Sequence, residues 1–187
     1  MDIQVYRTER KRMRHGVRAY AAYLLETVYK CSAPIEIGQF GKPEIAQTGG
    51  APLYFNGADS GDWVICAFAD RPIGVDLERV RTDRRVLSVA RRMFGGAEAA
   101  ALEQMPIRRR SLVFAEAWAK REAVMKWTGR GFNLPMAEIQ IDGEIPSGPD
   151  LPDDLALFAI PGFDSRRYAA WLCGQYKEKP RITLIRD

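Results

Sequence analysis

The alternation of apolar and polar positions is clearest between residues 63 and 80. The run "WVICAFA" is apolar throughout, which is typical of a buried strand. In the following "PIGVDLERV", the apolar Ile73, Val75 and Leu77 alternate with Gly74, Asp76 and Glu78. The segment between them, "DRP", is turn-forming. The pattern predicts two strands, 63–69 and 73–78, joined as a hairpin through a turn at residues 70–72.

Helical spacing of apolar residues marks the other long segments. It predicts helices over 8–30, 82–94, 97–104 and 108–128, of which the last has the strongest pattern. Gly-Gly at 95–96 would end the second of these helices. Strands are expected at 137–142, 155–160 and 167–173, and "ITLI" near the C-terminus predicts a short final one.

The order of these elements repeats. A long helix followed by antiparallel strands occurs near 8–78 and again near 108–173. We therefore predict an α+β fold made of two similar halves, residues 1–80 and 81–187, with the functional site in the cleft between them. The break near Val80 places Asp76 and Glu78 at this junction, where ligand sites are common.

Composition narrows the class of protein. A chain of 187 residues with 47% apolar and 28% charged residues is typical of a soluble globular protein. No apolar run reaches the roughly 20 residues of a membrane span, and "MDIQVYRTERKRMRHG" has no secretory apolar region. The three cysteines lack metal-ligand spacing and lie in or beside apolar segments, which favours three buried or inert thiols in a reducing cytoplasm. The net charge is +4, and most of the basic residues are arginine. This charge is compatible with an acidic protein partner, a phosphorylated ligand or nucleic acid, and it does not distinguish among them.

Asp76 and Glu78 raise the first chemical question. Residues two apart in a strand point to the same side, so these carboxylates project together about 7 Å apart. Like charges so placed repel unless a cation lies between them. The alternative is the ordinary polar face of a surface strand.

The helix at 108–128 carries a third carboxylate. One row at i, i+4 spacing begins with two large aromatic residues and continues with charged ones: Phe114, Trp118, Glu122 and Lys126. An exposed Glu–Lys pair is the plain alternative, but the aromatic start of the row favours a partly buried position. Three carboxylates suit a hard cation such as Mg²⁺, and a chain with one histidine disfavours zinc. The residues alone imply phosphoryl-type chemistry or pyrophosphate cleavage with magnesium.

Four motifs in order resemble those of a known family. "GVDLE" at 74–78 and "WAKREAVMKWTGRG" at 118–131, preceded by "GKP" at 41–43 and "FNGADSGDW" at 55–63, are similar to the motifs of the Sfp-type 4′-phosphopantetheinyl transferases. The resemblance covers roughly residues 40 to 135. It implies transfer of the 4′-phosphopantetheine arm of coenzyme A to a serine of an acyl or peptidyl carrier protein, an acidic partner, with release of adenosine 3′,5′-bisphosphate.

The resemblance also implies roles for individual residues. Asp76, Glu78 and Glu122 would bind Mg²⁺, and Glu122, or a water that it positions, would accept the proton of the carrier serine. Lys126 would stabilise the departing phosphate, and Lys42 would contact the coenzyme A nucleotide.

The chain departs from the family's motifs at three places. The Ser-His pair that helps to hold the coenzyme A phosphates is Ala58-Asp59 here, so Asp59 is expected at those phosphates, where it would recruit a second metal or turn away. Arg121 stands where the motif has lysine. Only "MDIQVY" precedes the first predicted helix, where the family has a further strand segment.

Two other functions remain open from the sequence. A catalytically weakened relative would act as a carrier-protein or nucleotide binding module. A nucleic-acid-binding protein would explain the arginines but not the aligned carboxylates, so we expect neither a nucleic-acid nor a membrane partner. Because the expected cleft lies within one chain, we also expect a monomer.

Overall fold

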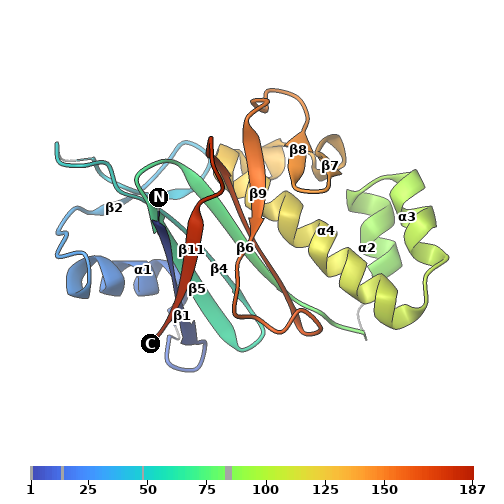
Figure 1. Ribbon diagram of the computed structural model, residues 1–187, viewed down its shortest axis with the longest axis horizontal. Helices are drawn as coiled ribbons and strands as arrows, with labels where there is room; N and C mark the ends of the chain where they lie inside the picture. The colour runs from blue at the N-terminus through green and yellow to red at the C-terminus, as the bar shows by residue number, and fades with distance from the viewer. Residues whose placement is uncertain (1, 14, 48, 83–85) are drawn as a thin grey trace.

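The computed structural model describes residues 2–13, 15–47, 49–82 and 86–187, and it has the predicted α+β composition. The helices are α1 (Gly16–Thr27), α2 (Val86–Met93), α3 (Gly96–Glu103) and α4 (Ile107–Thr128). Short 3₁₀ turns follow α4 at Gly131–Asn133 and Met136–Glu138. As Figure 1 shows, α1 lies at one end of the molecule and α2 and α3 at the other, with the strands and α4 between them.

The first sheet has the strand order β11-β1-β5-β4. It contains β1 (Asp2–Glu9), β4 (Tyr54–Ser60), β5 (Trp63–Ala69) and β11 (Arg181–Arg186). β1 and β11 are parallel, and the other neighbours are antiparallel. Helix α1 covers one face of this sheet, where Tyr20 and Leu24 pack with Phe55 and Phe68.

The second sheet has the order β6-β10-β9 and is antiparallel. Its strands are β6 (Ile73–Arg79), β9 (Leu155–Ala159) and β10 (Tyr168–Gln175). Ile73, Val75 and Leu77 of β6 share one core cluster with Ile3 and Ile65 of the first sheet. The other side of the second sheet packs against α4, with Cys173 beside Val124 in a separate cluster. The two sheets are thus packed together, with α1 outside one and α4 outside the other.

Two small hairpins complete the fold. They pair β2 (Ile35–Ile37) with β3 (Pro43–Ile45), and β7 (Gln140–Asp142) with β8 (Ile145–Ser147). The order helix, small hairpin, antiparallel strand pair therefore occurs twice, first from α1 to β5 and then from α4 to β10. Each run is followed by a strand that pairs within the other sheet, β6 beside β10 and β11 beside β1. The similarity of the two halves and their division at residue 80 stay predictions.

The predicted hairpin between residues 63–69 and 73–78 is wrong, although both strands exist. β5 pairs with β1 on one side and β4 on the other, so neither of its edges is left for β6. β6 instead pairs with β10. Side chains of β4 make the link between the sheets: Asn56 Oδ1 accepts a hydrogen bond from Val75 N at 2.8 Å, and Ser60 Oγ accepts one from Arg79 N at 3.0 Å.

The N-terminal helix is shorter than predicted. It begins at Gly16, because residues 2–9 form a strand held between β5 and β11. Alternation within "DIQVY" was the signal for this strand, with Ile3 and Val5 fully buried. The expected strand at 137–142 is also shorter, since a 3₁₀ turn occupies its first residues. Of the predicted helices, those at 8–30 and 82–94 include residues 14 and 83–85, which lie outside the described residues.

Two further expectations concern the thiols and the membrane. Cys66 and Cys173 are buried free thiols and Cys31 is partly exposed, so the prediction of buried cysteines is confirmed for two of the three. Within the described ranges, every helix is too short or too polar to cross a lipid bilayer.

Candidate active site

The site is built where α4 crosses β6. Gly74 makes the close approach possible: a Cβ atom there would lie 2.1 Å from Ala123 O and 2.3 Å from Trp127 N. Gly74, Asp76 and Glu78 share one face of β6, and this is the face that α4 covers. The glycine of "GVDLE" thus brings the helix backbone onto the strand, beside the two carboxylates.

Asp76 is the most buried of the predicted site residues, with 7% of its surface exposed. Lys126 Nζ of α4 lies 2.7 Å from Asp76 Oδ1, so the ammonium neutralises this carboxylate. Among the described residues, Asp76 Oδ2 is buried without a hydrogen-bond partner. A buried carboxylate oxygen of this kind is costly unless a cation or donor reaches it.

Glu122 lies one helical turn before Lys126 and is half-buried. Burial is the main cause that raises the pKa of its carboxyl group, and the charge of Asp76 raises it further. Lys126 lowers that pKa, and Glu78 raises it. The structure therefore brings the three predicted carboxylates into one electrostatic environment.

A bound cation would have to displace Lys126 from Asp76. In the ranges that the structure describes, no three Asp, Glu, His or Cys side chains are grouped as closely as the ligands of a metal ion. The donor set is nevertheless all-oxygen, and one of its oxygens is buried without a partner. Both properties fit a hard divalent cation better than a soft one.

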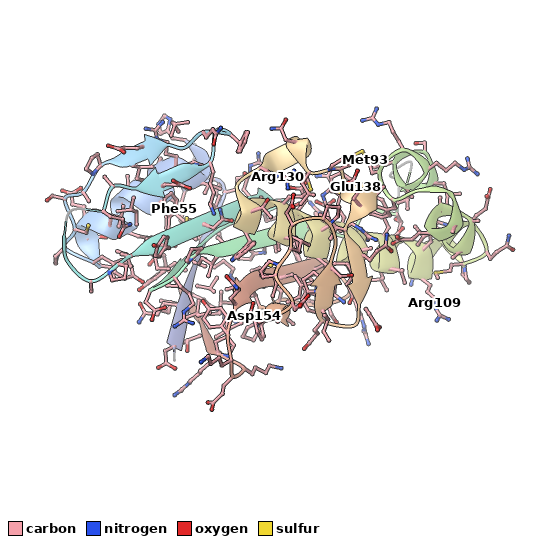
Figure 2. The ribbon with its side chains drawn as sticks, turned by 90° about the horizontal axis from the view of Figure 1, so that it is seen from above. Phe55, Met93, Arg109, Arg130, Glu138 and Asp154 are labelled. Carbon is pink, nitrogen blue, oxygen red and sulfur yellow. The ribbon has the colours of Figure 1, made fainter. Side chains whose placement is uncertain are left out.

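A cavity of about 280 Å³ adjoins these residues. It is lined by the start of β3 with the loop before it, by β4, and by the end of α4 with the residues after it: Phe40, Gly41, Lys42, Pro43, Asn56, Gly57, Glu122, Met125, Lys126, Gly129 and Gly131. Figure 2, seen from above, shows the labelled Phe55 of β4 on one side of Arg130, with Met93 and Arg109 on the other. The cavity is thus formed where the first sheet meets the end of α4.

Lys42 reaches this cavity from the "GKP" segment. Its Nζ lies 3.5 Å from Ile73 O and 3.4 Å from Trp127 O, so it spans the start of β6 and the last turn of α4. Burial lowers the pKa of this ammonium, while Glu44 raises it. Helix α4 ends next to it at Gly129, whose φ of 70° is in the left-handed region. Lys42 is therefore brought to the same cavity as Glu122 and Lys126, which lie about 80 residues further along the chain.

Asp59 lies outside the lining of this cavity. It is exposed on β4, and its Oδ2 lies 3.0 Å from Arg10 Nη2, in the turn after β1. Ala58, in contrast, is buried in the core between the sheets. The carboxylate at position 59 is thus neutralised by an arginine that sequence analysis did not single out.

Arg121, at the motif's lysine position, points away from the cavity. Its guanidinium binds Glu98 of α3 through Nη1–Oε1 at 3.2 Å and Nη2–Oε2 at 2.7 Å. It also donates from Nε to Ile139 O at 3.1 Å. This buried arginine links α4 to α3 through its ion pair with Glu98.

Asn56 is the residue of the site that sequence reasoning missed. It lines the cavity, and it carries the hydrogen bond to β6 described above. The available signal was an asparagine directly after two aromatic residues, Tyr54 and Phe55, because asparagine is depleted in strands.

Comparison with known proteins shows to which family the chain belongs. A sequence profile of the 4′-phosphopantetheinyl transferase superfamily matches residues 72–170, which is more than half of the chain. The chain belongs to this superfamily. The matched region contains β6 and α4, so the superfamily relationship and the crossing that forms the site involve the same residues.

Curated members of the superfamily align over a larger part of the chain. The 4′-phosphopantetheinyl transferase Sfp of Bacillus subtilis (strain 168) is 29% identical over 79% of this chain and 66% of its own length. 4′-Phosphopantetheinyl transferase psf-1 of Bacillus pumilus is 33% identical over 56% of this chain and 45% of its own. AcpT of Salmonella typhi is 31% identical over 59% of this chain and 55% of its own. The chain spans less than two thirds of the length of these relatives, and the resemblance inferred from the motifs is confirmed.

Proposed function

We propose that the protein transfers the 4′-phosphopantetheine arm of coenzyme A to a serine of an acyl or peptidyl carrier protein. The main support for this proposal is that Lys42, Glu122 and Lys126 line one cavity, in a chain that belongs to the transferase superfamily. Lys126 is also paired with the buried Asp76. The named relatives are 4′-phosphopantetheinyl transferases, which supports the same reaction class.

Asp76, Glu78 and Glu122 would hold Mg²⁺. When bound, the cation would neutralise charge on the pyrophosphate of coenzyme A and activate it toward displacement. The unpartnered Asp76 oxygen supports this assignment.

The remaining steps belong to the chain's own residues. The carrier serine Oγ forms a bond to the phosphorus next to pantetheine, and the bond from that phosphorus to the bridging oxygen breaks, releasing adenosine 3′,5′-bisphosphate. Glu122, or a water that it positions, accepts the serine proton as the general base. Lys126, released from Asp76, and Lys42 stabilise the negative charge of the leaving group.

The binding-module alternative is favoured by one observation. Asp59 stands in place of the family's histidine, and a carboxylate does not donate to phosphate. A chain that binds carrier protein or nucleotide without transfer would show this pattern. The acidic carrier partner, the monomeric state, the cytoplasmic location and the lack of nucleic-acid or membrane partners stay predictions under both functions.

Two substitutions separate the enzyme from the module. Asp76→Ala and Glu122→Gln should each abolish transfer to an apo carrier protein, while carrier binding, measured by surface plasmon resonance, stays within about threefold of wild type. Ser88→Ala is the control: Ser88 is on α2, outside the cavity lining, so this variant should transfer at the wild-type rate. Transfer that is unchanged in both site variants would contradict the proposed site.

A further inference from the structure

Two buried polar side chains of β4 bond to the backbone of β6. Asn56 Oδ1 accepts a hydrogen bond from Val75 N at 2.8 Å, and Ser60 Oγ accepts one from Arg79 N at 3.0 Å. Asn56 is 6% exposed and Ser60 is 7% exposed, so both bonds are largely screened from water. A buried backbone N–H is costly when its acceptor is removed. The two side chains therefore hold β6 in place against β4.

The register of the two strands depends on these side chains. β4 and β6 are edge strands of separate sheets, and they lie side by side (Figure 1). Both bonds join residues that are 19 positions apart in the chain, so the strands run parallel. Ala58, between Asn56 and Ser60 on the same face, is apolar and belongs to the same core cluster as Leu77. Two side chains thus take the role that a backbone ladder has inside a sheet.

The two bonds flank the carboxylates of β6. Val75 directly precedes Asp76, and Arg79 directly follows Glu78. Because β6 is bonded to β4 at both ends of this segment, a shift of either carboxylate along β4 would break a largely buried hydrogen bond. Groups that orient metal ligands commonly change metal affinity by roughly 10- to 100-fold when they are removed.

The strand that holds β6 also forms the wall of the cavity. Asn56 and Gly57 line it, and Lys126 Nζ, which is paired with Asp76, lies 3.4 Å from Gly57 O. The register of β6 against β4 therefore also sets where the carboxylates lie relative to the cavity. We propose that Asn56 and Ser60 are positioning residues that hold the two carboxylates of β6 in the arrangement that binds the divalent cation. This inference rests on the metal site of the proposed function.

Mn²⁺ titration followed by electron paramagnetic resonance tests this role without turnover. Asn56→Leu and Ser60→Ala each remove one acceptor, and each should weaken Mn²⁺ binding by roughly 10-fold or more. Ser60→Thr keeps a hydroxyl at the same position and should keep most of the wild-type affinity. Should Asn56→Leu fail to fold, as judged by circular dichroism, the comparison of Ser60→Ala with Ser60→Thr decides by itself.

The matched control removes a hydrogen bond on the other side of the first sheet. Tyr20→Phe deletes the bond from Tyr20 Oη to Asp187 Oδ2 at 2.6 Å, in the core between α1 and the sheet. This variant should lower the urea midpoint as the two β4 variants do, but it should bind Mn²⁺ with wild-type affinity.

Amide hydrogen exchange in EDTA gives a second readout that needs no metal. The Val75 amide should exchange faster in Asn56→Leu, and the Arg79 amide should exchange faster in Ser60→Ala, because each loses its acceptor. Both amides should keep their wild-type rates in Tyr20→Phe.

The outcomes separate this inference from the metal site itself. Wild-type Mn²⁺ affinity in Asn56→Leu and Ser60→Ala, despite faster exchange of the two amides, would show that the bonds serve stability alone and would overturn the inference while the metal site stands. An equal loss of affinity in Tyr20→Phe would overturn it too, since lower stability would then explain the effect. A wild-type protein that binds no Mn²⁺ would overturn the metal site and this inference with it.

Discussion

Lys126 Nζ lies 2.7 Å from Asp76 Oδ1, and this ion pair ties the last turns of α4 to the middle of β6. The pair is largely screened from water, with side-chain exposures of 28% for Lys126 and 9% for Asp76. The lysine thus occupies one oxygen of the carboxylate that we propose as a metal ligand. A metal ion and Lys126 would compete for Asp76.

Lys126→Met should therefore tighten the binding of a divalent cation. If the pair contributes about 1 kcal/mol, the affinity should rise roughly fivefold. Mn²⁺ titration followed by electron paramagnetic resonance measures this without turnover. The matched control is Lys120→Met on the same helix, since Lys120 Nζ pairs with Glu116 at 2.8 Å and donates to Gly143 O, on another face. Unchanged or weaker Mn²⁺ binding in Lys126→Met would exclude competition.

Glu122 should make stability depend on pH when no divalent cation is present. Its folded-state pKa is raised, mainly by burial and then by Asp76, so its contribution to stability is fully present below the unfolded value of 4.5. That contribution is lost as pH rises through the raised pKa. Urea unfolding in EDTA, from pH 4 to pH 8, should show this loss in wild type.

Glu122→Gln removes the titrating group. In EDTA at pH 8 it should be at least as stable as wild type, and its stability should vary less with pH. Mg²⁺ should stabilise wild type more than this variant. A Gln variant that keeps the wild-type pH profile would show that another group causes it.

Gly74→Ala tests the close crossing of α4 and β6. The added Cβ would meet Ala123 O at 2.1 Å, so strand and helix must move apart. We expect a loss of about 1–3 kcal/mol in the free energy of unfolding, with weaker cation binding because Asp76 and Glu122 separate. Gly96→Ala is the control, since a Cβ there meets nothing within 4 Å. Equal urea midpoints for the two variants would contradict the contact.

Arg121→Lys would restore the family's residue and yet destabilise the protein. A lysine cannot make the two-pronged contact that Arg121 makes with Glu98, and we expect a cost of about 1–3 kcal/mol in urea unfolding. Arg91→Lys is a matched control, because Arg91 contacts both carboxylate oxygens of Glu103 at an exposed position and should cost less than about 1 kcal/mol. A stabilised Arg121→Lys would show that the buried pair is dispensable.

The parts of the site that sequence could predict are those set by local periodicity. Alternation placed Asp76 and Glu78 on one face of a strand, and helical spacing placed Glu122 and Lys126 on one face of a helix. The structure brings these faces together. Gly74 is part of the sequence motif, but the sequence does not show that the backbone of α4 packs directly on it.

The parts that could not be predicted depend on partners distant in sequence. The apolar run of β5 is compatible both with one arm of a hairpin and with a strand between two others. The pairing of β5 with β1 determines which of the two arrangements forms. The strand at residues 2–9 is stable because β5 and β11 bind both its edges. In the same way, nothing local to Asp59 indicates that Arg10 neutralises it.

Intact-protein mass spectrometry tests the central claim most directly. A mixture of apo carrier proteins is incubated with coenzyme A and Mg²⁺, with and without this protein, and in a parallel sample with EDTA. We predict that at least one carrier gains the mass of a phosphopantetheinyl group only when the protein is present, and that EDTA prevents the gain. No gain on any carrier, from protein shown by circular dichroism to be folded, would contradict the transferase function and favour the binding module.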